Sequence, residues 1–230
     1  MEYLSNIELY YTPPENFSGN YIVLNGEEFR HAAKVMRHTA GEIIYVTNGQ
    51  GRIFECEISG IEKDNFKLIN KKEFDYGNRL RKVYFCIPKL KNADRFEFAL
   101  EKSIELGVTN FIVYDAERSP VKGHKTERWQ KIALAAMKQS LRSFLPRIIT
   151  VGSIKDIAVR KGNKYVFEQK SGNKFYTTDK EYDNDSYFVF GPEGGLSEGE
   201  LNYFEDNEIY SLYENRLRSE TAVVVCASIL

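Results

Sequence analysis

Residues 190–200 read Phe190-Gly191-Pro192-Glu193-Gly194-Gly195-Leu196-Ser197-Glu198-Gly199-Glu200 and continue an apolar run that starts at residue 187. Ser197 and Glu200 have the S-x-x-E spacing of a capping box, so a helix is expected to begin here. A strand followed by a glycine-rich turn and a helix places that turn at the carboxyl end of the strand, where parallel sheets bind ligands. The stretch matches neither an ATP-binding loop nor G-x-G-x-x-G. It predicts a ligand loop in an α/β sheet, with a plain tight turn as the alternative.

Strands and helices alternate through the part of the chain that contains this loop. Strands are expected at residues 83–87, 111–114, 148–151, 165–167, 187–190 and 209–212. One helix is expected to begin after Asn92 and end at Gly107, and a second to begin at Thr126 and stop before Pro146. This alternation predicts a parallel sheet with helices on its faces.

The first 70 or so residues have a different pattern, with short β-type runs at 21–24, 42–47, 52–59 and 65–70. One helix is expected at 27–37, with a buried face formed by Phe29, Ala32, Ala33 and Met36. These elements suggest a small barrel. Residues 75–78 are a plausible linker, so we expect one domain at 1–74 and a second at 75–230.

Composition excludes several classes of protein. The chain has 230 residues, of which 42 % are hydrophobic and 28 % charged, which is ordinary for a globular protein. No apolar run approaches the roughly 20 residues of a membrane span, and the acidic N-terminus lacks the pattern of a secretory signal. The 3 cysteines are widely spaced, which argues against a disulfide framework, and the histidines lack metal-ligand spacing. We therefore expect a cytoplasmic protein without a metal.

Charge is balanced over the whole chain but not along it. The formal net charge is −1, yet residues 81–147 carry 14 basic and 7 acidic side chains. Such a segment suits phosphate groups of a nucleic acid. A solvated, lysine-rich surface is the alternative.

Three further stretches place arginines at the ends of predicted elements. Residues 212–222 read Leu-Tyr-Glu-Asn-Arg-Leu-Arg-Ser-Glu-Thr-Ala, and lead from a strand into an apolar helix. Residues 116–122 follow another strand and contain Glu117-Arg118-Ser119, and residues 139–142 contain Gln139-Ser140-x-Arg142. Arginine at such positions is suited to bidentate contacts with phosphates.

Taken in order and spacing, these motifs resemble the small-subunit ribosomal RNA methyltransferase E family. The resemblance also includes Glu105-Leu106-Gly107, Arg128-Trp129 and, in the first domain, His31-x-x-x-Val35-x-Arg37 with Gly41-Glu42. It implies an N-terminal PUA-like barrel and a C-terminal SPOUT domain with a trefoil knot, a fold that no periodicity argument predicts. It further implies a homodimer that uses S-adenosylmethionine to methylate N3 of one uridine in the decoding region of 16S rRNA.

The resemblance also implies roles for individual residues. Cofactor contacts are expected from two loops and the start of the last helix: Gly191, Pro192, Glu193, Gly194, Gly195, Leu212, Tyr213, Arg216, Leu217, Thr221 and Ala222. Arg218 and Glu220 are the catalytic candidates, with anchoring of the loop as an alternative role for Glu220. RNA contacts are expected from His31, Arg37, Arg118, Lys122, Arg128 and Arg142.

Two alternatives stay open at the level of sequence. Tyr213 stands where the family usually has glycine, so the chain could be an RNA-binding protein that has kept the fold without the activity. Alternatively, the enzyme could act on another RNA, since related SPOUT proteins modify tRNA or large-subunit RNA.

Overall fold

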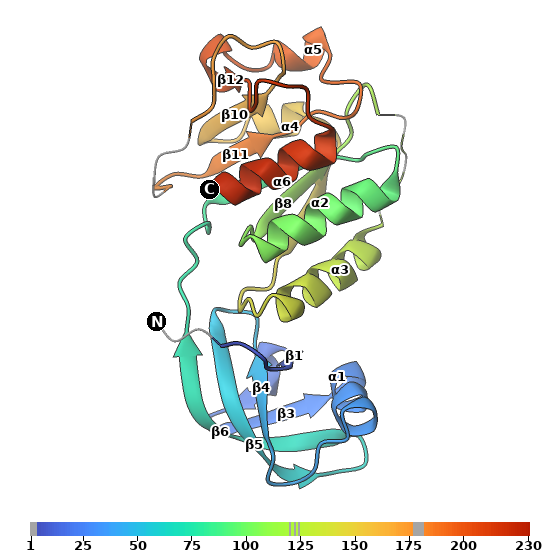
Figure 1. The fold of residues 1–230 in the computed structure, drawn as a ribbon, viewed down its shortest axis with the longest axis vertical. Coiled ribbons are helices and arrows are strands. Elements are labelled where there is room, and N and C mark those ends of the chain that lie inside the picture. Colours follow the sequence, from blue (N-terminus) through green and yellow to red (C-terminus); the bar gives the residue numbers. More distant parts are fainter. Residues whose placement is uncertain (1–3, 120, 122, 124, 177–181) are drawn as a thin grey trace. The chain divides into compact units, whose positions relative to one another are not determined.

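The computed structural model describes residues 4–119, 121, 123, 125–176 and 182–230. The chain divides into two compact units, each seen in Figure 1. The first unit comprises residues 1–78 together with 137–145, and the second comprises 79–136 and 146–230. The break after residue 78 falls at the end of the expected linker. The assignment of 137–145 to the first unit has no counterpart in the sequence pattern.

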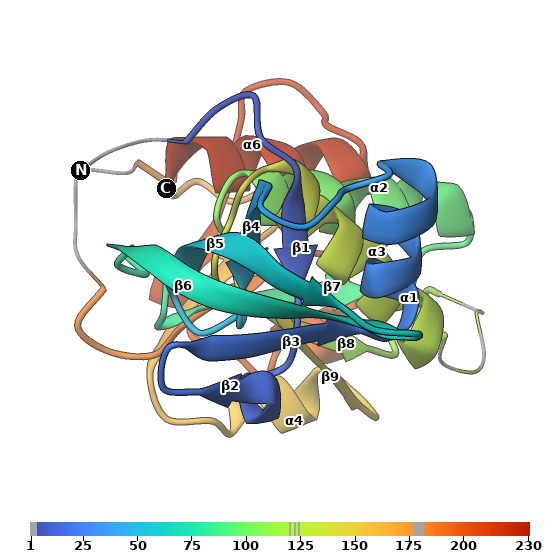
Figure 2. The same cartoon turned by 90° about the horizontal axis from the view of Figure 1, so that it is seen from below.

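The first unit is built on a six-stranded sheet. Its strands are β1 (Leu9–Tyr11), β2 (Phe17–Ser18), β3 (Tyr21–Asn25), β4 (Ile43–Thr47), β5 (Arg52–Ile61) and β6 (Asn65–Asp75). They lie in the order β1-β4-β5-β6-β3-β2, and only the β1–β4 pair is parallel. Figure 2 shows the long strands β5 and β6 running side by side, with β3 next to β6. Strands β3 to β6 confirm the β-type runs of the sequence, whereas the short β1 and β2 were not expected.

The helical segment of the first unit differs from its sequence pattern. Helix α1 (Gly26–Arg30) continues as one turn of π-helix, η2 (His31–Val35), and a 3-10 turn, η1, covers Pro14–Asn16. Phe29 and Ala32 are buried in the core as predicted, but the prediction for Met36 is wrong, since 45 % of its surface is exposed. The N–H of Met36 bonds the carbonyl of His31, five residues back. This wider turn moves Met36 off the face that an α-helical spacing would give.

The turn at residues 48–51 explains why 137–145 belongs to the first unit. The N–H of Gly51 donates to the carbonyl of Ser143 at 2.9 Å, and the N–H of Leu145 donates to the carbonyl of Gly49 at 2.8 Å. Gly51 has a φ of +102°, and a Cβ there would lie 2.5 Å from the ring of Phe144. Glycine is therefore required at this position for both its backbone conformation and the space it leaves.

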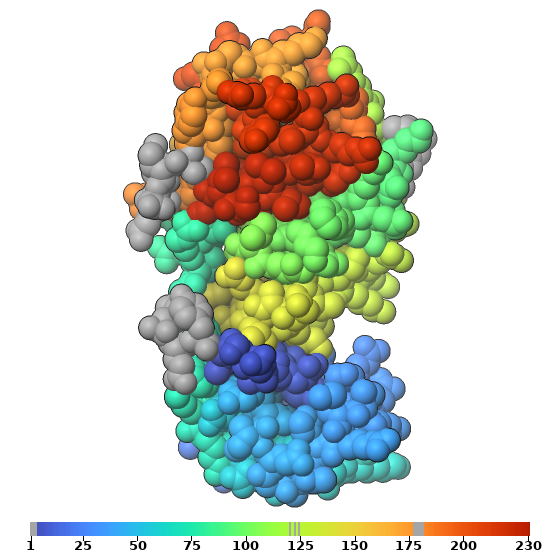
Figure 3. All heavy atoms as spheres, in the orientation of Figure 1, coloured from blue at the N-terminus to red at the C-terminus, as the bar shows by residue number. Residues whose placement is uncertain are grey.

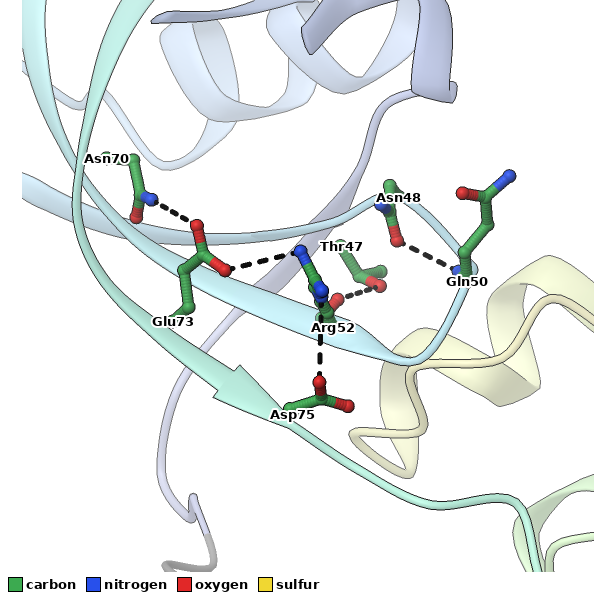
Figure 4. A network of polar contacts seen from close by, with 7 residues as sticks. All are labelled: Thr47, Asn48, Gln50, Arg52, Asn70, Glu73 and Asp75. Atoms are coloured by element: carbon green, nitrogen blue, oxygen red, sulfur yellow. Dashed lines mark hydrogen bonds and ion pairs between the residues drawn. The ribbon is translucent and has the colours of Figure 1, made fainter. Parts of the chain in front are cut away.

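Polar side chains at the ends of β5 and β6 surround the same turn, as Figure 4 shows. Arg52 lies 3.5 Å from Glu73 and 3.7 Å from Asp75, and Asn70 donates to Glu73 at 2.9 Å. Within the turn, the N–H of residue 50 donates to the side chain of residue 48. Because the ion pairs are exposed, each contributes no more than about 1 kcal/mol. Their contribution to the stability of the first unit is therefore small.

The second unit contains the predicted parallel sheet. Its strands are β7 (Val83–Pro88), β8 (Asn110–Tyr114), β9 (Arg147–Val151), β10 (Asn163–Phe167), β11 (Ser186–Val189) and β12 (Ile209–Tyr210). The order is β12-β10-β11-β7-β8-β9, and every neighbouring pair is parallel. Strand β11 is buried along its whole length, as expected when helices cover both faces of a sheet.

The helices of the second unit are α2 (Ala93–Glu105), α4 (Lys155–Ala158), α5 (Glu198–Leu201), α6 (Ser219–Ile229) and the 3-10 turn η3 (Asp206–Glu208). Helix α3 (Thr126–Gln139) contains the boundary with the 137–145 segment. Asn92 caps α2 as predicted, because its side chain accepts from two N–H groups of the first turn. Figure 3 shows the surface of α6 next to that of α2. Among the described residues, no helix is both long and apolar enough to cross a membrane.

Candidate active site

A cavity of about 960 Å³ lies in the second unit, at the carboxyl ends of β10 and β11. It is lined by the segment after β10, the glycine-rich loop after β11 and the loop that leads into α6. Its lining residues are Arg95, Arg118, Phe167–Lys170, Phe190–Leu196, Glu198, Leu201, Leu212, Tyr213, Arg216–Ser219 and Ala222. The carboxyl ends of parallel strands are where such sheets bind ligands, so this is the candidate active site.

Side chains from three other elements hold the glycine-rich loop by its carbonyl groups. The Tyr114 hydroxyl donates to the carbonyl of Phe190 and the Ser219 hydroxyl to that of Gly191, each at 2.6 Å. The Arg118 guanidinium donates at 3.0 Å to the carbonyl of Gly194, and at the same distance to that of Leu196. Burial holds the pKa of the Tyr114 phenol well above its usual value, so this phenol remains a donor at neutral pH. The loop is thus fixed before any ligand binds.

The predicted capping box is confirmed at the end of this loop. The Ser197 side chain accepts from the N–H of Glu200, and the Glu200 carboxylate accepts from the N–H of Ser197 at 2.9 Å. The second carboxylate oxygen of Glu200 accepts from the N–H of Glu117 at 3.0 Å. This buried carboxylate therefore joins the start of α5 to the loop that carries Arg118.

The loop before α6 is tied to the segment after β10. The Gln169 side-chain amide donates to the carbonyls of Tyr213 and Glu214, both at 3.3 Å. Tyr213 lines the cavity with 55 % of its surface exposed. The side chain that departs from the family pattern therefore lies beside the cavity, with room to move.

The structure brings together ten of the eleven residues predicted to contact the cofactor. All of them line the cavity except Thr221, whose side chain is exposed on α6. Ala222, the next residue, does line it, because successive residues of a helix point about 100° apart. The contacts themselves stay predictions.

The two catalytic candidates lie in different surroundings. Arg218 lines the cavity. Glu220 does not line it and is only 8 % exposed. One of its oxygens, Oε1, lies 3.5 Å from Nε of Arg95, while Oε2 is buried without a hydrogen-bond partner among the described residues.

The residues predicted to contact RNA do not form one group. Of those that the structure describes, only Arg118 lines the cavity. Arg128 forms two bonds with Glu97, at 2.5 and 2.6 Å, which raise the pKa of its guanidinium above the usual value. The first unit contains His31, Arg37 and Arg142, and Lys122 lies outside the described residues.

Sequence reasoning missed two contributors to the cavity. The Phe167–Lys170 segment begins at the last residue of β10, and its signal was its place at the end of a predicted strand at 165–167. Arg95 lies in the first turn of α2, where the basic side chain looked like ordinary surface charge. Arg95 lies beside the cavity because of the order of the strands in the sheet, and the local sequence pattern does not reveal that order.

Side chains that could bind a metal ion are scattered over the described part of the chain. No cluster of three or more His, Cys, Asp or Glu side chains there could hold a metal ion. All three cysteines are buried and free.

Two family models match the chain. The RNA methyltransferase domain matches residues 78–230, and the RNA methyltransferase PUA domain matches residues 24–69. The chain is 30 % identical to ribosomal RNA small subunit methyltransferase E of Bacillus subtilis, covering 89 % of this chain and 87 % of the relative. It is 29 % identical to the protein of the same name from Aquifex aeolicus, covering 94 % and 96 %.

Solved structures agree with these sequence matches. The crystal structure of ribosomal RNA small subunit methyltransferase E from Neisseria gonorrhoeae, bound to S-adenosyl methionine, has a TM-score of 0.84 and 27 % identity, covering 96 % of this chain and 95 % of that one. A probable rRNA-methyltransferase from Porphyromonas gingivalis has a TM-score of 0.81 and 26 % identity, covering 96 % and 95 %. The resemblance drawn from the motifs is thereby confirmed, and this chain belongs to the ribosomal RNA small subunit methyltransferase E family of RNA methyltransferases.

Proposed function

We propose that this enzyme transfers a methyl group from S-adenosylmethionine to N3 of one uridine in the decoding region of 16S rRNA. The observation that carries the proposal is the cavity formed by the glycine-rich loop and the loop before α6, within the domain matched to RNA methyltransferases. The relatives named above for small-subunit rRNA methylation, and the neighbour bound to S-adenosyl methionine, support it.

The cavity suits S-adenosylmethionine in size and chemistry. Its volume of about 960 Å³ is at the upper end of the range for small-molecule sites. Apolar side chains for an adenine ring come from Phe190, Leu212 and Leu217, and carboxylates for a cationic ligand come from Glu168 and Glu198. When bound, S-adenosylmethionine supplies an electrophilic methyl group and leaves as a neutral thioether.

The protein has two tasks in the proposed reaction. Uridine N3 lies on the pairing edge, so the base must leave its pair and enter the site, at a cost of a few kcal/mol. N3 must also lose its proton, which passes to solvent water, and this leaves negative charge on the uracil oxygens. We infer that Arg218 stabilises this charge from the cavity wall. Glu220 lies outside the lining, so a role in orienting an arginine fits it better than contact with the base.

Contacts with the rRNA are assigned to basic residues of both units. We infer that Arg118 contacts RNA next to the cavity, and that Arg128, Arg142, Lys122, His31 and Arg37 contact phosphates elsewhere. The match of residues 24–69 to the PUA domain of RNA methyltransferases supports a role for the first unit in RNA binding.

The finer features of the family are part of the proposal as well. They comprise closure of the first unit as a PUA-like barrel (1–74), a trefoil knot in the SPOUT domain (75–230), and action in the cytoplasm. They also include a homodimer. Exposed apolar side chains on α2 and α6, Phe98 at 48 % and Ile229 at 40 %, favour a second copy of the chain as the partner of this face.

Replacing Arg218 tests the catalytic assignment. Arg218→Ala is expected to lower kcat at least 100-fold, because a lost oxyanion donor costs about 2.7–4 kcal/mol, while the Kd for S-adenosylmethionine stays within a few-fold. Radiometric methyl transfer measures the first and calorimetry the second. Lys155→Ala, an exposed change on α4 away from the cavity lining, is the matched control. Near-normal transfer by Arg218→Ala would refute the role.

A further inference from the structure

A second cavity adjoins the candidate active site. It has a volume of about 550 Å³ and is lined by Lys91, Asn92, Arg95, Arg118 and Glu193. Arg95, Arg118 and Glu193 also line the first cavity, so the two share a wall. Lys91 and Asn92 line only the second one, and they lie in the segment that joins β7 to α2.

The lining of the second cavity is strongly basic. It contains the cations of Lys91, Arg95 and Arg118 against the single carboxylate of Glu193. That carboxylate already accepts from the backbone N–H of Lys91, at 3.2 Å. Within the described part of the chain, neither Lys91 nor Arg118 forms a side-chain ion pair, and the bonds of Arg118 go to uncharged carbonyls. The cavity therefore has positive charge that the protein itself leaves uncompensated.

Arg95 forms an ion pair with the buried carboxylate of Glu220. Its Nε lies 3.5 Å from Oε1 of Glu220, which is 8 % exposed, whereas the Arg95 side chain is 38 % exposed. Glu220 has no other hydrogen-bond partner at Oε2 among the described residues. Burying a carboxylate without a full set of partners is costly, so separating Arg95 from Glu220 would be unfavourable. The pair therefore keeps the Arg95 side chain between the two cavities. A guanidinium held at Nε still has donors for a bidentate contact with an anion.

Asn92 completes the chemistry of this site. Its side-chain oxygen accepts from the N–H groups of Asp94 and Arg95, at 2.8 and 3.3 Å. The amide nitrogen of Asn92 is thereby left as a donor in the lining. Donors and cations suit a phosphate group, and among the residues that the structure describes no carboxylate beyond Glu193 lines the cavity to repel it.

We propose that the second cavity binds a backbone phosphate next to the target nucleotide, through Lys91 and Arg95, and that Glu220 is a positioning residue for Arg95. The inference rests on the proposed function, since it places this phosphate beside the cavity for the methyl donor. A phosphate bound here holds the flanking backbone while the base enters the first cavity. The anion could also come from the carboxylate of S-adenosylmethionine, and the experiment separates these two sources.

The experiment compares Lys91→Gln, Arg95→Gln and Glu220→Gln with Lys155→Gln as the matched surface control. A fragment of 16S rRNA is titrated with each full-length variant over a range of salt concentrations, and the affinity for S-adenosylmethionine is measured by calorimetry. Lys91→Gln is expected to weaken RNA binding about fivefold to tenfold and to reduce the salt slope by about 0.7, the value for one phosphate contact on a single strand. Its affinity for S-adenosylmethionine is expected to remain within twofold, because Lys91 does not line the first cavity.

Glu220 is tested through a double change. Arg95→Gln and Glu220→Gln are each expected to weaken RNA binding, and the combination to be no weaker than Arg95→Gln, because Glu220 acts through Arg95. Wild-type RNA affinity and salt slope in Lys91→Gln and Arg95→Gln would overturn the phosphate site. Loss of S-adenosylmethionine binding with RNA binding intact would overturn it too, and assign the cavity to the donor's carboxylate. Since RNA binding is measured directly, absence of methyl transfer by the wild type would reject the proposed reaction separately.

Discussion

Single side chains fix the glycine-rich loop, and each does so by contacting its backbone. Tyr114, Ser219 and Arg118 donate to carbonyls of this loop. Glu200 accepts two bonds at the end of the loop. A rigid loop spares a ligand the entropy of ordering it. Loss of one of these contacts is therefore expected to weaken the binding of a ligand to the loop.

Ser219 offers the cleanest test of this expectation. Ser219→Ala removes the 2.6 Å bond to the carbonyl of Gly191 and is expected to weaken S-adenosylmethionine binding about fivefold, equivalent to about 1 kcal/mol. Ser228→Ala is the matched control, because its hydroxyl bonds a carbonyl within the same helix and lies outside the cavity lining. Calorimetry measures both. Equal affinities in the two variants would contradict the role of Ser219.

Gly51 gives a second residue-level prediction, for the stability of the first unit. Gly51→Ala is expected to lower the free energy of unfolding by at least about 2 kcal/mol, since it combines backbone strain with a clash against Phe144. Gly41→Ala, at a φ of +89° with open space around it, carries the strain alone and is expected to cost about 1 kcal/mol. Urea denaturation compares them. A Gly51→Ala variant as stable as Gly41→Ala would argue against the packing of 143–145 on this turn.

Local chemistry explains which residues could be predicted from the sequence. Asn92 and the Ser197–Glu200 capping box act on neighbouring N–H groups, so their spacing was sufficient. Met36 was placed wrongly because the helix widens before it. The contact of Arg95 with Glu220 joins residues 125 positions apart, and no local pattern contains it.

At the scale of elements, hydrophobic periodicity was a good guide and strand order was not. The six strands of the parallel sheet were each anticipated within a few residues, because buried parallel strands have continuous apolar runs. The order β12-β10-β11-β7-β8-β9 depends on crossovers between distant segments. This order determines which loops meet at the cavity, so the segment after β10 was missed while the loop after β11 was found.

The three cysteines lie on three different elements, β5, β7 and α6, and this yields a prediction about alkaline pH. Burial raises the pKa of Cys56 to about 12, and the pKa values of Cys86 and Cys226 also lie above their usual range. A thiol whose pKa is raised by folding stabilises the native state below its unfolded pKa of about 8.5, and this stability is lost as the pH rises through the folded value. The pKa of Lys164 is lowered by burial, so this group acts in the opposite direction. Burial also raises the pKa of several tyrosines, among them Tyr114 and Tyr165, and these act in the same direction as the thiols above about pH 10.

The expected outcome is therefore a free energy of unfolding that falls between pH 8.5 and 12, by at most about 1.4 kcal/mol per thiol and pH unit. At pH 8, a thiol reagent should modify none of the cysteines in the native protein and all 3 after unfolding in urea. Rapid modification of the native protein would show that these thiols are more accessible than the structure has them.

For the whole molecule, the distribution of charge indicates a nucleic-acid ligand, and the exposed apolar surface indicates a protein partner. The basic stretch at 81–147 contains Lys91, Arg95 and Arg118, three of the cations beside the candidate active site. Its other members are distributed over both units, so sequence charge alone indicated the class of ligand without its position. The apolar helix α6 packs on α2, while Ile229 remains exposed.

The proposed homodimer is tested by placing a charge on the face formed by α2 and α6. Phe98→Asp is expected to give a monomer in sedimentation velocity at concentrations where the wild type is a dimer, because a buried unpaired carboxylate in an interface costs several kcal/mol. Tyr176→Asp, at an aromatic side chain 75 % exposed in the second unit, is the control and should leave the wild-type state unchanged. A dimeric Phe98→Asp would exclude this face as the interface.

Methyl transfer to the small ribosomal subunit tests the proposed reaction itself. Small ribosomal subunits are purified from cells that lack this protein and incubated with it and S-adenosylmethionine labelled in the methyl group, and the modified nucleoside is then identified and mapped. We expect N3-methyluridine at a single site in the decoding region of 16S rRNA. Labelled small subunits with a different nucleoside or site, or no label in 16S rRNA despite tight cofactor binding, would contradict it.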